Sequence, residues 1–343
     1  MFILGIESTC DETAAAIVKD GCAILSQVVA SQEDLHEQYG GVFPELASRR
    51  HAEVIIPVIH EAISKAGLSW QDLTAIAVAH GPGLIGSLLI GINTAKALSL
   101  AWELPLVGVN HVEAHLYAAR MGQKELPAGK ALGVVLSGGH TFLAEIASLG
   151  EYQLIGTTID DAIGEAFDKV AALLGLPYPG GPAVEALAKD GDPGRYTLPK
   201  GRVKSSPFDF SFSGLKTAVL YAVKGHQGKK NSPSQLPEEE KKHIAASFQE
   251  TAFCDIAAKC LLAAQKIDAK AIYLGGGVCQ NRRLRALLQE KIPHLPLFWP
   301  EPSLCTDNAA MIAGLGYHKY KANPQGNFPY IEPMTRMAPF ALV

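Results

Sequence analysis

Near the N-terminus, short apolar runs alternate with polar or glycine turns, and longer segments with helical spacing follow. Three apolar runs, Phe2–Glu7, Ala14–Lys19 and Ile24–Ala30, predict a meander of antiparallel strands. From Glu45 to Ala66 apolar positions recur at helical spacing, and the pattern stops at Gly67. This segment is therefore predicted to be a long helix.

The following segments complete one α/β unit, and the same order then begins again. Strand Leu73–Ala79, helix Ser87–Trp102 and strand Leu106–Val109 give the order β-β-β-α-β-α-β. A second apolar meander is predicted further along. Its strands are Leu132–Leu136, Thr141–Ala147 and Gln153–Thr157.

The rest of the chain extends the second unit with additional helices. The predicted helices are Ala162–Leu174, Gly181–Lys189, Ser213–Val223, His243–Lys266, Arg282–Lys291 and Asp307–Tyr320, with strands Ala271–Leu274 and Leu297–Trp299 between the last three. We expect a two-lobed α/β fold with a cleft between the lobes. The expected lobes are residues 1–110, with 322–343 packing back on them, and residues 111–321.

Two segments rich in Gly, Pro, Ser and Lys separate these helices. Residues Gly191–Ser206 and Gly225–Glu240 are predicted to be exposed loops. Either they contact partners or they are plain surface linkers.

Composition restricts the class of protein. A chain of 343 residues with 48% hydrophobic residues can form two compact domains. Because its net charge is −4, it could bind a nucleic acid only through a local basic patch or through another subunit. The six cysteines contain no CxxC pair, which is typical of reduced thiols. The N-terminal sequence lacks the basic start of a signal peptide, and polar residues interrupt the apolar stretch Leu84–Trp102. We therefore expect a cytoplasmic protein in which this stretch is a buried helix and not a membrane span.

The motif His111-Val112-Glu113-Ala114-His115 follows a predicted strand directly. On a helix, histidines at i and i+4 share one face and can bind one metal ion. Glu113 does not adjoin the first histidine, so the motif differs from the HExxH of metalloproteases. The alternative is a pair of capping or core histidines.

A third ligand is needed for a metal site, and Asp307 at the start of the last helix is the best candidate. The helix dipole favours a carboxylate there, although a simple N-cap would account for it equally. Two histidines and one carboxylate suit iron(II), zinc or manganese and leave positions open for phosphate oxygens.

Three glycine-rich turns are interpreted as turns after strands in the second half, and each alone could be a plain tight turn. They are Ser137-Gly138-Gly139-His140-Thr141, Gly180-Gly181-Pro182 and Gly275-Gly276-Gly277-Val278. Such turns let main-chain N–H groups approach an anion, and three of them indicate a nucleotide site. Neither a Walker A lysine nor a GxGxxG fingerprint after a strand is present.

A polar turn, Glu7-Ser8-Thr9-Cys10-Asp11-Glu12-Thr13, joins the first two strands. Its carboxylates either act on a water or an amine or simply cap the hairpin. Asp11 and Glu12 are the candidate catalytic residues.

Together these segments resemble the tRNA threonylcarbamoyladenosine transferase family, formerly called O-sialoglycoprotein endopeptidase. The similar segments occur in the family's order along nearly the whole chain. They are GIESTCDET, FPELASRRH, HGPGLIGSLLIG, NHVEAH, LSGGHT, FDKVA, YPGGP, FSFSGLKTA, LGGGV-x-x-N and TDNAAMIA.

The resemblance implies the actin, sugar-kinase and Hsp70 type of fold. It also implies transfer of a threonylcarbamoyl group from threonylcarbamoyl-adenylate to N6 of the adenosine 3′ of the anticodon, in tRNAs that read codons beginning with A, with release of AMP. By resemblance, His111, His115 and Asp307 bind one divalent ion per subunit, with Fe²⁺ favoured over Zn²⁺ or Mn²⁺. The implied adenylate contacts are Val135, Leu136, Ser137, Gly138, Gly139, Asp168, Gly181, Glu185 and Asn281. Many relatives carry Asp where this chain has Glu185.

The resemblance also implies three partners: tRNA, a small ATPase, and a catalytically silent paralogue that pairs with the first lobe through a helical face. The candidate helices are Glu45–Ala66 and Ser87–Trp102, and homodimers through the same face are an alternative. Two other functions compete with this one. A carbohydrate kinase or ATPase of the same fold would leave the histidines unexplained. A non-catalytic partner-binding lobe would leave them without metal.

Overall fold

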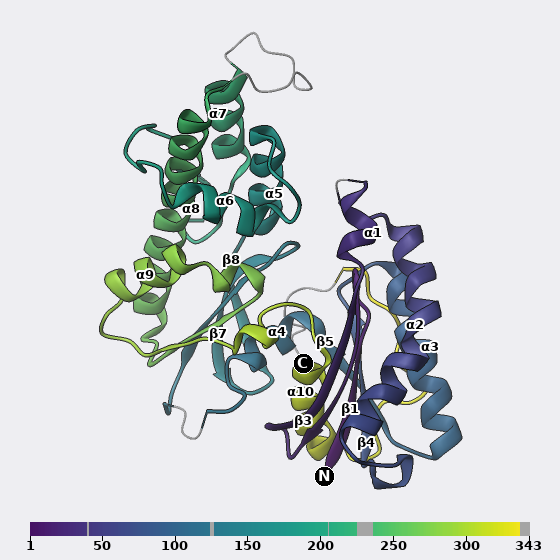
Figure 1. Cartoon of the computed structure of the whole chain (residues 1–343). Coiled ribbons are helices and arrows are strands. Elements are labelled where there is room, and N and C mark those ends of the chain that lie inside the picture. The colour runs from purple at the N-terminus through teal and green to yellow at the C-terminus, as the bar shows by residue number, and fades with distance from the viewer. Residues whose placement is uncertain (40, 124–126, 205, 225–235, 337–343) are drawn as a thin grey trace. The chain divides into compact units, whose positions relative to one another are not determined.

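The computed structural model describes residues 1–39, 41–123, 127–204, 206–224 and 236–336, and its contacts divide the chain into two compact units (Figure 1). The first unit comprises residues 1–126 and 300–343, and the second comprises residues 127–299. These boundaries differ from the expected 1–110 and 111–321. The chain between residues 111 and 126 and the last long helix both belong to the first unit.

The first unit is built on a five-stranded sheet with the order β3-β2-β1-β4-β5. Neighbouring strands β1, β2 and β3 are antiparallel, whereas β4 and β5 are parallel to β1. Its strands are β1 (Phe2–Glu7), β2 (Glu12–Lys19), β3 (Ala23–Ser31), β4 (Ala75–Gly81) and β5 (Leu106–Asn110). Its helices are α1 (Glu33–Glu37), α2 (Pro44–Lys65), η1 (Trp70–Asp72), α3 (Ile85–Trp102), α4 (His111–Ala118), η3 (Pro302–Leu304) and α10 (Ala309–Ala322).

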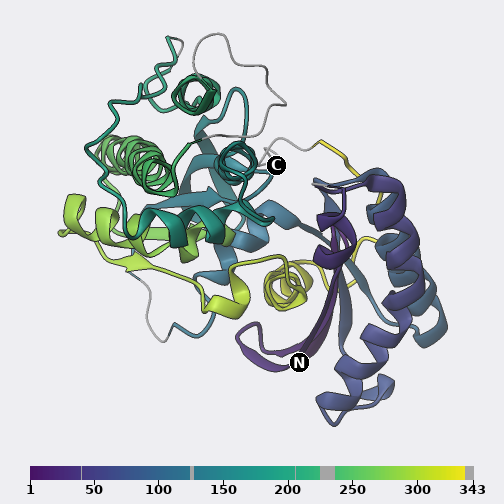
Figure 2. The same cartoon turned by 45° about the horizontal axis from the view of Figure 1, so that its top comes forward.

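Alternation along β1 gives the sheet two different faces. Leu4 and Ile6 point into a core shared with α2 and α3, which cover one face of the sheet (Figures 1 and 2). On the opposite face Gly5 lies against α10, and a Cβ atom there would come within 2.2 Å of the Ala309 carbonyl oxygen. This close packing of α10 on the sheet explains why the helix belongs to the first unit.

The second unit repeats the same topology, since its sheet has the order β10-β9-β6-β7-β8. Its strands are β6 (Ala131–Leu136), β7 (Thr141–Ser148), β8 (Glu151–Thr157), β9 (Ile272–Gly275) and β10 (Leu297–Phe298). Its helices are α5 (Ile163–Leu174), α6 (Gly180–Ala188), α7 (Ser213–Lys224), α8 (Glu238–Ile267), η2 (Gly277–Gln280) and α9 (Arg282–Lys291). The prediction of a duplicated unit with helical insertions is confirmed.

The start of helix α8 differs from prediction more than the other element boundaries do. Helix α8 begins at Glu238 and not at His243, because three glutamates in its first turn are favoured by the helix dipole. Residues 238–240 are therefore helical and not part of the predicted loop Gly225–Glu240, of which residues 225–235 lie outside the described part. Residues 191–204 and 206 form no regular element, as predicted for a loop.

Helix α3 has one buried and one exposed apolar face. Leu88, Ile92 and Ala95 belong to the core, whereas Ile85 and Leu100 are exposed. Within the described residues, α3 is the one helix whose length and composition would allow it to cross a membrane, and 33% of it is buried in this unit. The expectation of a buried helix therefore holds for one face only.

Candidate functional site

His111 and His115 lie on α4, which begins directly after β5. The Asn110 side chain starts this helix, because its Oδ1 accepts hydrogen bonds from the N–H groups of Val112, at 2.9 Å, and Glu113, at 3.1 Å. The predicted helical spacing is confirmed, and the two imidazole rings lie nearly perpendicular to each other with their Nε2 atoms 3.2 Å apart. Both histidines are buried.

Asp307 completes this group from the residue before the N-cap of α10. Asn308 is that cap, with its Oδ1 accepting from the Met311 N–H at 3.0 Å, so Asp307 does not have the capping role that its position allowed. Asp307 Oδ1 lies 3.1 Å from His115 Nε2 and 3.4 Å from His111 Nε2. The structure therefore brings the three predicted metal ligands together.

Glu7, at the end of β1, orients the first histidine. Its Oε2 lies 2.8 Å from His111 Nδ1, and its Oε1 accepts from the Thr9 N–H at 2.6 Å. When the carboxylate accepts a hydrogen bond from the Nδ1–H group, the Nε2 atom of the ring is left free to bind a cation. The sequence pattern does not predict this role of Glu7, and the only available signal is an acidic residue at the end of an apolar strand.

The electrostatics of the group are strongly coupled. Burial opposes protonation of His111, but the charges of Glu7 and Asp307 outweigh it and raise the pKa of His111 well above its usual value. Burial alone would raise the pKa of Asp307, yet the charge of His111 holds that pKa well below its usual range. Without a metal ion, the carboxylates of Glu7 and Asp307 therefore favour the protonated, positively charged form of His111.

The donor set fits a divalent metal ion. Two buried imidazole nitrogens at 3.2 Å cannot both be acceptors without a cation or a proton between them. Two nitrogens and one carboxylate oxygen, with further positions open, match iron(II), zinc and manganese sites. Glu7 supplies the carboxylate that commonly supports a metal-binding histidine.

In the same unit, Asp11 lies in the turn between β1 and β2, and Glu12 is the first residue of β2. Burial, and then the charges of Asp307 and Asp11, raise the pKa of Glu12 to about 10. The raised pKa favours the protonated form of Glu12 at neutral pH, in which its carboxyl group can donate a hydrogen bond.

Helix α2 holds this turn through the buried His51, a contact that the sequence pattern does not predict. His51 Nδ1 lies 2.7 Å from Thr13 Oγ1, and His51 Nε2 lies 3.0 Å from the Cys10 carbonyl oxygen. Burial lowers the pKa of His51, which keeps the ring neutral. The turn is therefore fixed by the fold.

In the second unit, the turn Ser137–His140 joins β6 to β7. The Ser137 N–H donates to the His140 carbonyl at 2.8 Å, and the His140 N–H donates to Ser137 Oγ at 3.0 Å. Gly138 and Gly139 are exposed, and no atom lies within 4 Å of the position that a Cβ would take. An open turn of this kind can present main-chain N–H groups to an anion.

The other glycine turns pack around this one and around α5. Gly276 approaches the Ser137 Cβ, and Gly164 of α5 lies directly against Gly138. Val135 and Leu136 are fully buried in β6, so their contact with a ligand stays a prediction. The first and third glycine turns are thus neighbours within one unit.

Asp168 and Gly181 lie where α5 meets α6. Asp168 Oδ1 accepts from the Gly180 N–H at 2.7 Å, which fixes the N-terminus of α6. Gly181 follows at once, with open space beside it. The second glycine turn is therefore joined to α5 through Asp168.

Glu185 and Asn281 meet at the N-terminus of α9. Glu185 Oε1 accepts from the Arg282 N–H at 2.8 Å, and Asn281 Oδ1 accepts from the Arg283 N–H at 2.9 Å. The Asn281 Nδ2 group donates to Gln249 Oε1 at 2.8 Å. The predicted adenylate contacts thus also fix the N-termini of two helices.

Comparisons with known proteins place these features in a family. Residues 23–314 match the family TsaD, described as tRNA N6-adenosine threonylcarbamoyltransferase. A protein of that name from Protochlamydia amoebophila (strain UWE25) is 56% identical over 336 residues, covering 98% of both chains. Another from Bacillus subtilis (strain 168) is 46% identical over 331 residues, covering 96% of this chain and 93% of the relative.

Solved structures share the fold at low sequence identity. The HypF protein of T. kodakarensis has a TM-score of 0.60 at 15% identity, covering 93% of this chain and 48% of that chain. The ROK hexokinase from Thermus thermophilus has a TM-score of 0.52 at 15% identity, covering 95% of this chain and 100% of that chain. The expected actin, sugar-kinase and Hsp70 type of fold is confirmed.

Proposed function

We propose substrates and residue roles for this chain, which belongs to the TsaD family of tRNA N6-adenosine threonylcarbamoyltransferases and is an enzyme of tRNA modification. The donor is L-threonylcarbamoyladenylate. The acceptor is N6 of the adenosine 3′ of the anticodon in tRNAs that read codons beginning with A. AMP is released.

The observation that carries this proposal is the convergence of His111, His115 and Asp307, with Glu7 behind the first histidine. We assign these residues to one divalent ion per subunit, with Fe²⁺ favoured and Zn²⁺ or Mn²⁺ as alternatives. A kinase or ATPase of the same fold needs carboxylates around magnesium and gives no reason for two adjacent buried imidazoles. The histidine pair therefore favours the acyl transferase over the kinase.

The chain's own residues then have distinct roles. A divalent ion, when bound, supplies positive charge for the phosphate oxygens of the acyl adenylate. Main-chain N–H groups of the Ser137–Gly139 turn bind an anionic group of the adenylate and stabilise negative charge there. Asp168, Gly181, Glu185 and Asn281 hold the nucleoside part.

Asp11 is the proposed base. The adenosine N6 attacks the carbamoyl carbon, the bond from that carbon to the phosphate oxygen breaks, and Asp11 accepts the proton that N6 loses. Protonated Glu12 donates a hydrogen bond beside it, consistent with its raised pKa. This division of roles assigns the two candidate carboxylates different functions.

We further propose a cytoplasmic location and three macromolecular partners: tRNA, a catalytically silent paralogue and a small ATPase. Exposed apolar side chains on α3, including Ile85, Leu89 and Leu100, support α3 as the face that pairs with the paralogue or, in isolation, with a second copy.

The test replaces His111 with Ala and measures metal content and transfer on the same preparation. We expect both to fall below detection, because one ligand and its Glu7 contact are lost. The exposed His294 changed to Ala is the matched control and should retain both. Full transfer by metal-free His111→Ala protein, or release of ADP in place of AMP, would refute the proposal.

A further inference from the structure

A stretch of the second unit between α6 and α7 concentrates positive charge. Between Asp192 and Asp209 the chain contains four basic residues and no acidic one. Arg195 is paired with Glu240 at 3.4 Å, whereas the other three are exposed. We call these three, Lys200, Arg202 and Lys204, the basic triad.

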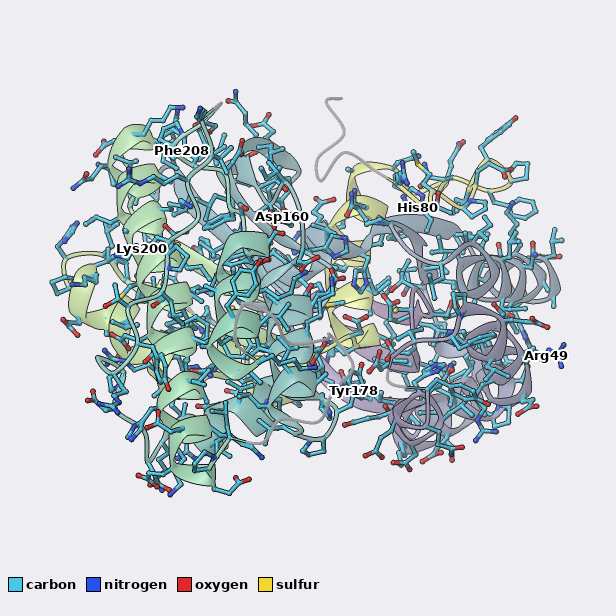
Figure 3. All side chains as sticks on the ribbon, turned by 90° about the horizontal axis from the view of Figure 1, so that it is seen from above. Arg49, His80, Asp160, Tyr178, Lys200 and Phe208 are labelled. Carbon is cyan, nitrogen blue, oxygen red and sulfur yellow. The ribbon has the colours of Figure 1, made fainter. Side chains whose placement is uncertain are left out.

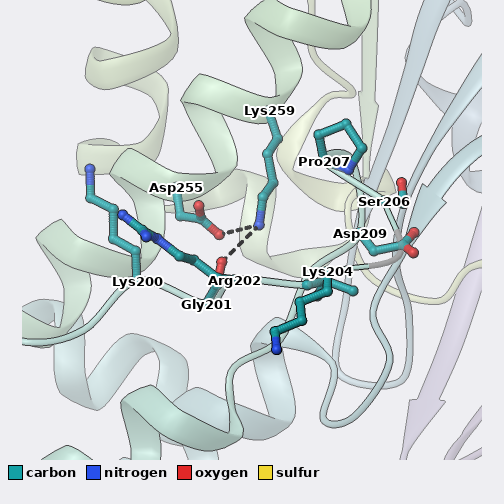
Figure 4. A pocket seen from close by; sticks show the side chains of 10 residues that line it. Lys200, Gly201, Arg202, Lys204, Ser206, Pro207, Asp209, Asp255 and Lys259 are labelled. Carbon is teal, nitrogen blue, oxygen red and sulfur yellow. Dashed lines mark hydrogen bonds and ion pairs between the residues drawn. The ribbon is translucent and has the colours of Figure 1, made fainter.

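The main chain of the triad is fixed on α8. Lys259 of α8 is only 8% exposed; its Nζ donates to Asp255 Oδ2 at 2.6 Å and to the Gly201 carbonyl at 3.5 Å. Gly201 also lies so close to Ser211 that a Cβ atom would come within 2.0 Å of the Ser211 carbonyl oxygen. Figure 4 shows the Lys259 ammonium between Asp255 and Gly201, with the triad side chains extending from this anchor.

The charge of the triad is not neutralised nearby. The cavity beside it, of about 410 Å³, is lined by two carboxylates. Asp255 is engaged by Lys259, and Asp209 accepts from the Thr157 N–H at 2.9 Å. Over the described ranges of the chain, no carboxylate lies within ion-pair distance of the triad.

The same face continues along α8. Lys266 lies on the face that carries Lys259, with its Nζ 4.5 Å from the centroid of the Phe208 ring. Figure 3 labels Lys200 and Phe208 on this part of the second unit. A fixed, concave and unneutralised basic surface suits a polyanion with regularly spaced charges.

We propose that the basic triad binds backbone phosphates of the tRNA substrate. This inference rests on the proposed function and adds a substrate-binding surface beyond the glycine turns. A chain with a net charge of −4 gains little attraction for RNA from its overall field, so a local patch must provide it. When the exposed ammonium and guanidinium groups contact phosphates, they release counterions that were bound to the RNA, and this release makes the binding salt-dependent.

The test compares two triple variants of the full chain. The triad variant carries Lys200→Ala, Arg202→Ala and Lys204→Ala. The control variant carries Lys130→Ala, Lys270→Ala and Lys291→Ala. The control removes the same number of positive charges, but from residues that form ion pairs elsewhere on this unit. The readout is the dissociation constant for unmodified tRNA, measured by fluorescence anisotropy over a range of salt concentrations.

We expect the triad variant to reduce the slope of log affinity against log salt by about two to three, since each phosphate contact contributes about 0.7 to 0.9. At low salt its dissociation constant should rise at least about tenfold. The control should keep the wild-type slope, and Lys200→Arg with Lys204→Arg should keep it as well. Equal slopes for the triad variant and the control would overturn the inference, as would binding of an acidic protein in place of tRNA.

Transfer assays separate this inference from the proposed function. If wild-type protein transfers the acyl group and the triad variant has an unchanged KM for tRNA, the inference fails and the function stands. If the wild type binds tRNA through the triad and transfers nothing, the function fails and the inference stands.

Discussion

At the scale of single residues, Glu7 determines whether His111 can serve as a ligand. Its two oxygens hold the His111 ring and the Thr9 N–H, so the ring orientation is fixed from β1. The sequence predicted the two histidines of this candidate metal site because histidines one helical turn apart are a recognisable pattern. It did not identify Glu7 or His51, because their partners are distant in the chain and are brought near only by folding.

We predict that Glu7→Gln weakens metal binding while the fold is retained. An amide is a weaker acceptor for the His111 N–H, and loss of such a support typically costs about 10-fold to 100-fold in metal affinity. A chelator-competition titration measures this effect. Glu45→Gln, at an exposed glutamate on α2, is the control. Unchanged metal affinity in Glu7→Gln would show that the carboxylate does not support the ligand.

At the scale of elements, Asp161 connects two inserted helices of the second unit. It lies just before α5 and pairs with Lys169 of α5 at 2.7 Å and with Lys216 of α7. Periodicity predicted both helices, since each buries one apolar face. The pattern of apolar positions did not predict that Asp161 links the two helices, because an ion pair between helices depends on three-dimensional packing.

We predict that Asp161→Asn lowers the free energy of unfolding by about 1–2 kcal/mol at pH 7 through the loss of charge-assisted hydrogen bonds. Burial alone would raise the pKa of Asp161, but its bonds to Lys169 and Lys216 lower it below the unfolded value. The stabilisation is therefore present above the unfolded pKa and is lost as pH falls through the folded pKa.

Urea unfolding of both proteins between pH 7 and pH 3 measures this dependence. The difference between wild type and Asp161→Asn should persist down to about pH 4 and then shrink, because the wild-type carboxylate becomes neutral. Asp190→Asn, at an exposed carboxylate of the same unit, should show no such trend. A difference that stays constant to pH 3 would exclude the ion pairs as its source.

At the scale of the whole molecule, the chain crosses between its units in a way that element order did not predict. Helix α10 follows β10 in sequence but packs on β1, where Gly5 permits close approach. The duplication was predictable because the strand and helix patterns repeat. The boundary between the two units was not predictable, because Gly5, which allows α10 to pack closely on β1, lies about three hundred residues earlier in the chain.

The exposed face of α3 also belongs to this scale. Ile85, Leu89, Ala97 and Leu100 recur at helical spacing and remain exposed, whereas the opposite face of α3 is part of the core. Exposed apolar stripes of this kind favour pairing with another helical surface. Because Leu89 and Leu100 are 40% and 65% exposed, changing them should leave the unit folded.

We predict that Leu89→Asp with Leu100→Asp weakens association with the paralogous chain at least about 100-fold, since two charges would be buried without partners. Sedimentation velocity and calorimetric titration measure the pairing and any self-association. Ile24→Asp with Leu25→Asp, at exposed apolar positions of β3, is the matched control and should bind as wild type does. If the α3 variant also binds normally, the partner uses another surface, and the apolar stripe must be explained without it.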